Sequence, residues 1–312
     1  MLDLTRKRIL VTGGNGFLGS HIIKELRNVG VSEIISPSSK VCDLRKEENI
    51  ISLLKDEQPN VVIHCAAAVG GIGANRDNPG SFFYENLIMG TQLMEQSRLS
   101  NVEKFVAIGT ICCYPKITPV PFKEEELWSG YPDETTGYYG LAKKMLLVQS
   151  KAYRKQYGFN SIFLMPVNIY GPGDNFIGEH AHVIPALVKK FVDAKVNKSE
   201  EVICWGTGMA TREFIYADDC AKAIVMATER YNSSEPVNIG TGQEMPIKNL
   251  AEKIAECIGY SGKIVWDRTK PDGQPRRCLD VTRAKEQFGF EATTSFDDGI
   301  KRTVDWDINN NL

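Results

Sequence analysis

The sequence predicts an α/β protein in which helices cover a doubly wound parallel sheet, with a smaller C-terminal lobe. In the first half, short apolar runs alternate with segments of helical periodicity. The apolar runs are nearly continuous, as in strands that are buried on both faces. A glycine-rich turn directly follows the first run, and after Pro166 the alternation gives way to loop-rich stretches, which indicates a second, smaller unit.

The expected elements follow one another in strand–helix order. The apolar runs predict strands at 8–12, 33–35, 61–64, 105–108 and 161–164. Helical spacing predicts helices at 20–29, 48–56, 82–99 and 139–157. Near the C-terminus, Phe296, Ile300 and Val304 recur every fourth residue and predict the buried stripe of a last helix.

Composition excludes several function classes. The 312 residues, 42% hydrophobic and 24% charged, are typical of a soluble globular protein. A net charge of -2 argues against nucleic acid as a partner. The N-terminus has no apolar signal region and no run reaches membrane-spanning length, so we expect no membrane partner. Eight cysteines without a Cys-x-x-Cys motif indicate free thiols and a cytoplasmic location.

The glycine-rich turn has the spacing of a dinucleotide-binding motif. Gly13, Gly16 and Gly19 lie between the first strand and the first helix, the context in which this motif binds a pyrophosphate. The helix N-terminus would supply N–H donors to the phosphates, and the turn includes Asn15, Phe17 and Leu18. The alternative is a glycine-rich turn without a ligand.

The segment after the second strand favours NADP(H) over NAD(H). An acidic residue there would bind the ribose 2′-hydroxyl and repel a 2′-phosphate, but the chain carries Ser38, Ser39 and Lys40. Asp43 and Leu44 follow and are expected to meet the adenine. The third strand is followed by small side chains that leave room for the cofactor, Ala66 and Ala67 among them.

A Tyr-x-x-x-Lys motif predicts proton transfer beside the nicotinamide. Tyr139 and Lys143 lie one helical turn apart and face the same way. We expect the ammonium to lower the pKa of Tyr139, which would give a proton to a carbonyl oxygen that also binds Thr110. The alternative is that both side chains only face solvent on a helix.

These motifs, in this order, resemble the extended short-chain dehydrogenase/reductase superfamily. Within it, the chain is most similar to the NADPH-dependent 3,5-epimerase-4-reductases that convert GDP-4-keto-6-deoxy-D-mannose into GDP-L-fucose. The resemblance covers nearly the whole chain. Its most specific segments are Val69-Gly-Gly-Ile-Gly-Ala-Asn75, Thr110-Ile-Cys-Cys-Tyr-Pro-Lys116, Gly171-Pro-Gly-Asp-Asn-Phe176, His182-Val-Ile-Pro-Ala-Leu187, Trp205-Gly-Thr-Gly-Met-Ala-Thr-Arg-Glu-Phe214 and Lys270-Pro-Asp-Gly-Gln-Pro-Arg276.

The resemblance implies a role for each matching residue. Tyr139 and Lys143 match the proton donor and its partner, and Thr110 retains the hydroxyl of the family's usual serine. Cys112 matches the epimerisation base and His182 the acid. Further cofactor contacts implied are Pro166, Asn168, Ile169 and His182, and implied substrate contacts are Asn168, Lys190, Trp205, Arg212 and Asp272.

Two positions depart from the pattern. Asn15 and Lys190 stand where some members carry arginines, for the 2′-phosphate and the substrate respectively.

The resemblance also implies a domain arrangement. Residues 1–170 would form the NADP-binding Rossmann domain, with a returning segment around 212–240, and 171–211 with 241–312 would form the lobe for the nucleotide sugar. Superfamily members often pair two long helices of each subunit. Apolar residues left over on 82–99 and 139–157 therefore predict a homodimer.

A 4-keto sugar explains why a reductase would carry a cysteine and a histidine. The ketone acidifies the hydrogens on its two neighbouring carbons, so a thiolate can remove one and an acid on the other face can return it inverted. Tyr139 and Thr110 would stabilise the enolate. Without the resemblance, Cys112 would be a small core residue and His182 a loop histidine. Glu179, His180 and His182 are a candidate zinc-binding group, but we expect no metal there.

Three functions are therefore weighed. The preferred one is epimerisation and reduction of the GDP-4-keto sugar. A related nucleotide-sugar 4-reductase or 4-epimerase acting on another sugar is the second. A catalytically silent NADP-binding regulator is the third, and the intact set Tyr139, Lys143, Cys112 and His182 argues against it.

Overall fold

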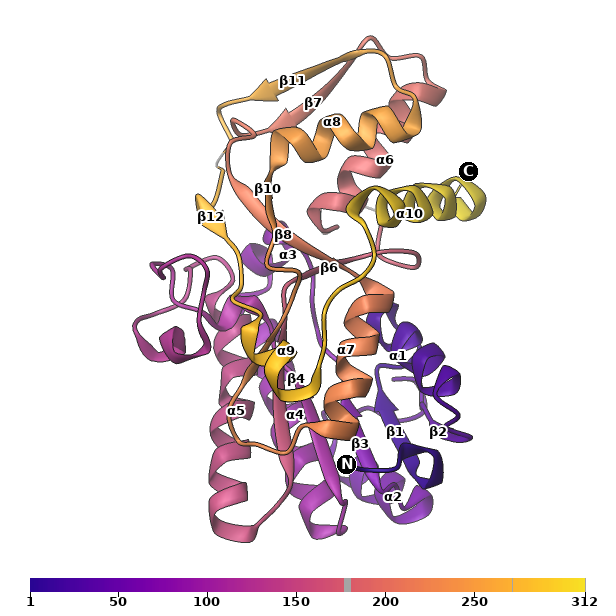
Figure 1. The fold of residues 1–312 in the computed structure, drawn as a ribbon, viewed down its shortest axis with the longest axis vertical. Coiled ribbons are helices and arrows are strands. Elements are labelled where there is room, and N and C mark those ends of the chain that lie inside the picture. The colour runs from indigo at the N-terminus through magenta and orange to yellow at the C-terminus, as the bar shows by residue number, and fades with distance from the viewer. Residues whose placement is uncertain (177–180, 271, 312) are drawn as a thin grey trace.

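The fold is a doubly wound parallel sheet with a smaller lobe at one end, as predicted (Figure 1). The computed structural model describes residues 1–176, 181–270 and 272–311. All strand pairs of the main sheet are parallel. Its strands, in spatial order, are β2 (Glu33–Ile35), β1 (Arg8–Thr12), β3 (Val61–His64), β4 (Lys104–Ile108), β5 (Ser161–Pro166) and β9 (Val237–Ile239).

Burial explains why these runs form the central strands. Every residue of β3, β4 and β5 is buried, which matches their continuous apolar sequence. The register pairs Thr12 with His64 and Ile108 with Leu164. Because the strands run in parallel, their carboxyl ends lie at one edge, where ligands bind in folds of this kind.

Helices cover both faces of the sheet (Figure 1). Right-handed crossovers place α1 on one face and the helices that follow β2, β3 and β4 on the other. Helix α1 packs beside α7, whereas α4 packs against both α2 and α5. Their bounds are α1 (Phe17–Asn28), α2 (Glu47–Glu57), α4 (Pro79–Leu99), α5 (Gly137–Tyr157) and α7 (Ala217–Arg230).

Short helices complete this part of the chain. They are η1 (Leu4–Arg6), α3 (Ile72–Asp77), η2 (Ile111–Cys113), η3 (Glu124–Trp128) and α9 (Thr282–Phe288). Within the described ranges, no helix combines the length and the apolar character needed to cross a membrane.

The smaller lobe lies beyond the carboxyl edge of the main sheet, at the top of Figure 1. Strand β8 pairs with three others, and β7 pairs in parallel with β11. The strands are β6 (Asn168–Tyr170), β7 (Glu201–Trp205), β8 (Thr211–Tyr216), β10 (Glu244–Pro246), β11 (Lys263–Asp267) and β12 (Arg276–Arg277). The helices are α6 (Val183–Val196), α8 (Ile247–Ile258) and α10 (Phe296–Asn311).

Two hydrophobic cores correspond to these two parts. The first surrounds the main sheet and includes the buried side chains of α9, Ala284 and Phe288. The second joins α6, α8 and α10, with Ile300 and Val304 buried as expected for the last helix. The division into domains at residues 170, 212 and 241 stays a prediction.

All the predicted elements are present, and the largest differences in their bounds lie at helix starts, although β5 also extends to Pro166. Helix α1 begins at Phe17 rather than at residue 20. Gly16 precedes it and provides no side-chain cap, so the sequence contains no capping residue that would have indicated this start. Helix α4 begins at Pro79, three residues before the predicted start, where proline suits a first helical position.

A glycine lets η2 approach α5 closely. A Cβ on Gly140 would lie 2.1 Å from the carbonyl oxygen of Cys112. The Cys113 thiol donates to the carbonyl of Gly140 at 3.3 Å, which is a second contact between η2 and α5. Only a residue without a side chain fits between them, and this contact determines where η2 lies on the helix.

We expect Gly140→Ala to force η2 away from α5 and to lower the free energy of unfolding by about 1–3 kcal/mol, as overpacking does. The matched control is Gly80→Ala in α4, because a Cβ there meets no atom within 4 Å. Denaturant unfolding measures both variants. Equal stability of the two would show that the contact at Gly140 is not constrained.

Candidate active site

The glycine-rich turn has the shape of a phosphate cradle. Strand β1 ends at Thr12 and Gly13 has φ +71°, a left-handed conformation that favours glycine. A Cβ there would lie 2.8 Å from the backbone of Ala66. Gly16 precedes α1 without a side-chain cap, so the first N–H groups of the helix are available to an anion. These features fit a dinucleotide pyrophosphate.

The other residues predicted for this turn lie around the cradle. Asn15 is exposed, and Phe17 and Leu18 are half-buried at the start of α1. A Cβ on Gly19 would lie 2.1 Å from the carbonyl oxygen of Gly13, so the helix packs closely on the turn.

The segment after β2 forms the expected adenosine side of the site. Ser39 and Lys40 are exposed and Ser38 is half-buried, so hydroxyls and a cation line this side. Arg45, which the sequence argument did not use, binds Asp43 with Nε and Nη2 at 2.9 Å. Its hydrogen bonds lower the pKa of Asp43 to about 2. Leu44 is buried.

Small residues after β3 continue the same edge. Ala66 and Ala67 are half-buried, and a buried amide fixes the next residue. Asn86 of α4 accepts from the Ala68 N–H at 3.2 Å and donates to its carbonyl at 2.8 Å. This bidentate contact holds the loop where the sequence predicted room for the cofactor.

Tyr139 and Lys143 point into the protein rather than into solvent. Tyr139 is 8% exposed and Lys143 2% exposed. Burial raises the pKa of Tyr139 well above its ordinary value, with further contributions from the thiols of Cys112, Cys113 and Cys65. Burial also lowers the pKa of Lys143 to about 8. The expected lowering of the tyrosine pKa is therefore wrong, since desolvation by burial is the main cause of the shift and raises it, and the phenol keeps the proton that it would donate.

The segment after β4 contains Thr110 and Cys112, and it packs against α5, the helix that carries Tyr139 and Lys143. Thr110 precedes η2, and its hydroxyl accepts from the Cys112 N–H at 3.2 Å. Cys112 is half-buried and close enough to Tyr139 to affect the tyrosine electrostatically. Cys113, on the other side of η2, is fully buried against α5. The structure thus brings together four of the five predicted catalytic residues.

His182, the fifth, lies at the start of α6 in the smaller lobe. Its Nδ1 is 3.9 Å from a carboxylate oxygen of Asp174, whose side chain is 4% exposed. The described contacts therefore place His182 against Asp174 and not against Cys112. Glu179 and His180 lie outside the described residues. In the part of the chain that is described, no group of three or more His, Cys, Asp and Glu residues could hold a metal ion.

The predicted cofactor and substrate contacts after β5 divide into two groups. Pro166 ends β5, whereas Asn168 and Ile169 belong to β6, where the Asn168 amide donates to the carbonyl of Glu213 at 2.8 Å. Lys190 lies over the exposed ring of Trp205, 5.7 Å from its centroid.

The second group surrounds Arg212. Arg212 donates to the backbone carbonyl of Asp272 at 3.3 Å, and the Asp272 carboxylate accepts from Thr207. Burial, and then the positive charge of Arg277, lowers the pKa of Arg212 to about 10.

Sequence reasoning missed two residues that contribute to the site. Arg277 Nη2 lies 3.8 Å from the Cys112 sulfur. Buried Glu213 accepts from the N–H groups of Thr241, Gly242 and Leu279 at 2.5, 2.8 and 2.6 Å. Glu213 lies within a segment quoted for the resemblance and Arg277 directly follows another, but their contacts join parts of the chain that are far apart in sequence.

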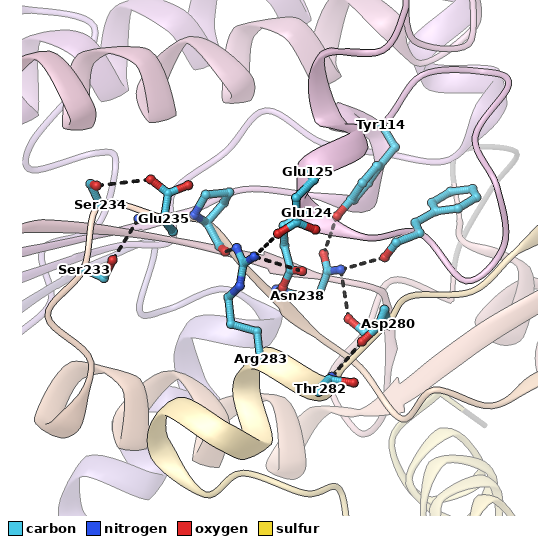
Figure 2. Close-up of polar contacts among 12 residues, drawn as sticks. Tyr114, Glu124, Glu125, Ser233, Ser234, Glu235, Asn238, Asp280, Thr282 and Arg283 are labelled. Carbon is cyan, nitrogen blue, oxygen red and sulfur yellow. Dashed lines mark hydrogen bonds and ion pairs between the residues drawn. The ribbon is translucent and has the colours of Figure 1, made fainter.

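A buried network fixes the loop that follows η2 (Figure 2). Asn238 of β9 accepts from the Tyr114 hydroxyl at 2.8 Å and donates to the carbonyls of Phe122 and Asp280 at 2.9 and 3.0 Å. Arg283 of α9 pairs with Glu125 of η3, the short helix at the end of this loop. The network therefore ties the loop after Cys112 to the segment that follows Arg277.

Comparisons with known proteins agree with this geometry. The model of the NAD dependent epimerase/dehydratase family matches residues 9–240. GDP-L-fucose synthase 1 of Arabidopsis thaliana is 40% identical over 97% of this chain and 94% of its own. GDP-L-colitose synthase of Yersinia pseudotuberculosis is 35% identical over 97% of this chain and 98% of its own.

A solved structure extends the likeness to the fold. A GDP-L-fucose synthetase from Naegleria fowleri bound to NADP superimposes with a TM-score of 0.91 at 28% identity, covering 100% of this chain and 95% of its own. The chain belongs to the NAD dependent epimerase/dehydratase family, and GDP-L-fucose synthases are among the relatives that it matches along almost its whole length.

Proposed function

We propose that this protein is an NADPH-dependent enzyme that converts GDP-4-keto-6-deoxy-D-mannose into GDP-L-fucose by 3,5-epimerisation and 4-keto reduction. One observation carries the proposal. The Cys112 thiol and the buried Tyr139–Lys143 pair lie together at the carboxyl edge of the sheet, beside a glycine-rich phosphate cradle. The names of the relatives support a GDP-sugar substrate.

Each side chain has a distinct task in the proposed reaction. Cys112, as thiolate, takes a proton from a carbon next to the ketone: an S–H bond forms, the C–H bond breaks, and its electron pair moves to the ketone oxygen. Tyr139 and Thr110 stabilise this enolate by hydrogen bonds. His182 returns a proton to the opposite face of the carbon, which inverts it.

Reduction uses the same oxygen contacts. NADPH, held by the glycine-rich turn, would supply the hydride for the ketone carbon. Tyr139, whose raised pKa keeps it protonated, gives its proton to the ketone oxygen. Lys143 is buried behind it and, with a pKa lowered to about 8, can restore that proton near neutral pH.

The substrate contacts are proposed from the two groups in the smaller lobe. Arg212 would bind the diphosphate, with Asp272 fixing its loop, while Lys190, Trp205 and Asn168 would bind the nucleoside and sugar. Since all eight cysteines are free thiols, we further propose a cytoplasmic location.

A second candidate is a related reductase or epimerase for another nucleotide sugar. It is favoured by the name of the colitose synthase relative and by the C. jejuni heptose reductase, whose structure has a TM-score of 0.92 with this chain. A plain reductase would not need a base at Cys112, so the function of this residue separates the proposed enzyme from a plain reductase. The sugar that is turned over separates it from an epimerase for another substrate.

We propose NADP(H) as the cofactor and expect NADPH to bind at least tenfold more tightly than NADH, which corresponds to about 1.4 kcal/mol. Hydroxyls and a cation, rather than an acid, follow β2 and suit a 2′-phosphate. Fluorescence titration with both cofactors measures the ratio, and Lys40→Ala should reduce it. The proposal fails if NADH binds equally well or better.

The two chemistries should separate by mutation. We expect Cys112→Ser to abolish solvent-deuterium exchange next to the ketone while NADPH still binds, because an alcohol is a far weaker acid than a thiol. Tyr139→Phe should do the reverse: hydride transfer falls by orders of magnitude while some exchange survives. NMR follows the exchange and absorbance follows NADPH on one substrate. Wild-type exchange and epimerisation in Cys112→Ser would leave the cysteine only a packing role.

We also propose a homodimer that pairs α4 and α5 of two subunits. Large apolar side chains are exposed on both helices, among them Tyr84 at 60%, Tyr138 at 50% and Val148 at 44%. Light scattering at micromolar concentration should give twice the chain mass of 34.8 kDa. We expect Val148→Asp to weaken the dimer and the control Ile308→Asp, on α10, to leave it intact. A monomer mass for the unaltered protein would rule the proposal out.

A further inference from the structure

Arg277 points at the Cys112 thiol from the far side of the site. It ends β12, the two-residue strand that pairs in parallel with β8, and it stands opposite Arg212 in the register. Its Nη2 lies 3.8 Å from the Cys112 sulfur. The preceding residue, Arg276, makes a bidentate contact with Glu244. Neighbouring side chains of a strand point to opposite sides, so only Arg277 turns toward the thiol.

In the described part of the chain, Arg277 is not paired with a carboxylate. Among the residues that the structure describes, no ion pair involves it, and its buried Nε has no hydrogen-bond partner. The ionisable groups close to Cys112 include the phenol of Tyr139 on α5, the thiol of Cys113 and the guanidinium of Arg277 on β12. Arg277 is therefore the cation in direct contact with the sulfur.

The two contacting segments are held rigidly to each other. Residues on either side of them form a short ladder, in which the Phe122 N–H donates to the carbonyl of Cys278 at 2.8 Å and the Asp280 N–H donates to the carbonyl of Phe122 at 2.9 Å. Asn238 closes the ladder by donating to the carbonyls of Phe122 and Asp280 (Figure 2). Phe122 belongs to the loop after Cys112, so these hydrogen bonds hold that loop against the segment that directly follows Arg277.

We propose that Arg277 is a positioning residue that keeps Cys112 as a thiolate before substrate arrives. The proton that leaves the thiol goes to solvent, and the guanidinium stabilises the remaining negative charge. When the thiolate then takes a proton from carbon, the sulfur becomes neutral. The role in epimerisation rests on the proposed function, but the thiolate itself does not.

A different role would leave the thiol unaffected. Arg277 and Arg212 stand side by side, and two neighbouring arginines could instead bind the diphosphate of a nucleotide sugar. That role alone would raise KM in an Arg277 variant and would not alter the reactivity of Cys112 in the free enzyme. The test must therefore read the thiol without substrate.

The direct test is the pH profile of Cys112 alkylation by iodoacetamide, an uncharged reagent that arginine does not attract. Mass spectrometry with fragmentation separates Cys112 from the adjacent Cys113. We compare the unaltered protein with the neutral variants Arg277→Met and Arg277→Gln and with Arg277→Lys, which retains the charge. The control is Arg276→Met, since Arg276 contacts Glu244 on the other side of the strand.

We expect the midpoint of the profile to rise by about one pH unit in both neutral variants, because an opposite charge at this distance favours the ionised form. It should stay near the original value in Arg277→Lys and in Arg276→Met. Thermal unfolding shows whether each neutral variant folds. An unchanged midpoint in a neutral variant that folds would overturn the proposal and leave Arg277 a phosphate contact.

Kinetics with the GDP-4-keto sugar then separate the two proposals. We expect solvent-deuterium exchange at pH 7 to fall in Arg277→Met by up to about tenfold, the upper limit for a shift of one pH unit in thiolate formation, and KM to change less. Suppose that the midpoint of alkylation shifts in the neutral variants, but that even the unaltered protein exchanges no deuterium into a 4-keto sugar. The proposed function then fails, while the proposal that Arg277 stabilises the Cys112 thiolate holds.

Discussion

The close contact between the Cys112 backbone and Gly140 is the constraint on which the site depends. It sets η2 directly on the first turn of α5, where a side chain of any size would separate them. As a result, the thiol of Cys112 lies close to Tyr139, and the Thr110 hydroxyl is held by the Cys112 N–H. A single glycine within the Tyr-x-x-x-Lys motif thus joins a proton donor and a base that come from different strand–helix units.

Burial determines the electrostatics of this arrangement. Desolvation raises the pKa of Tyr139 and lowers the pKa of Lys143 to about 8, so the phenol holds its proton and the amine releases its own more easily. The same burial therefore favours a protonated Tyr139, the proton donor, and a Lys143 that can return a proton to it. Cys112, on the more open side of η2, meets the cation of Arg277 instead.

The sequence predicted the main sheet well because its signals are local. Apolar runs and the glycine turn determine β1, β2 and β3, whose bounds agree with the prediction. The start of α1 was missed because Gly16 leaves no capping side chain to recognise. The pairing of β8 with three strands of the smaller lobe could not be predicted, since it joins segments far apart in the chain.

The same limit applies to the site. Tyr139 and Lys143 share one helix, so their proximity follows from spacing alone. The expected lowering of the tyrosine pKa was wrong because the pattern contains the lysine but not the burial. Arg277 and Asp174 make contacts that depend on how the lobe folds back on the sheet, and neither lies in a motif with a spacing rule.

The most direct test of this account is the product formed by the unaltered protein. It should be incubated in D2O with NADPH and, in turn, with GDP-, dTDP- and UDP-4-keto-6-deoxy sugars, and the products identified by NMR. The account predicts efficient turnover of GDP-4-keto-6-deoxy-D-mannose to GDP-L-fucose, with deuterium at C3 and C5 and one NADPH oxidised per product. A reduced sugar that keeps the starting configuration and carries no deuterium would contradict it.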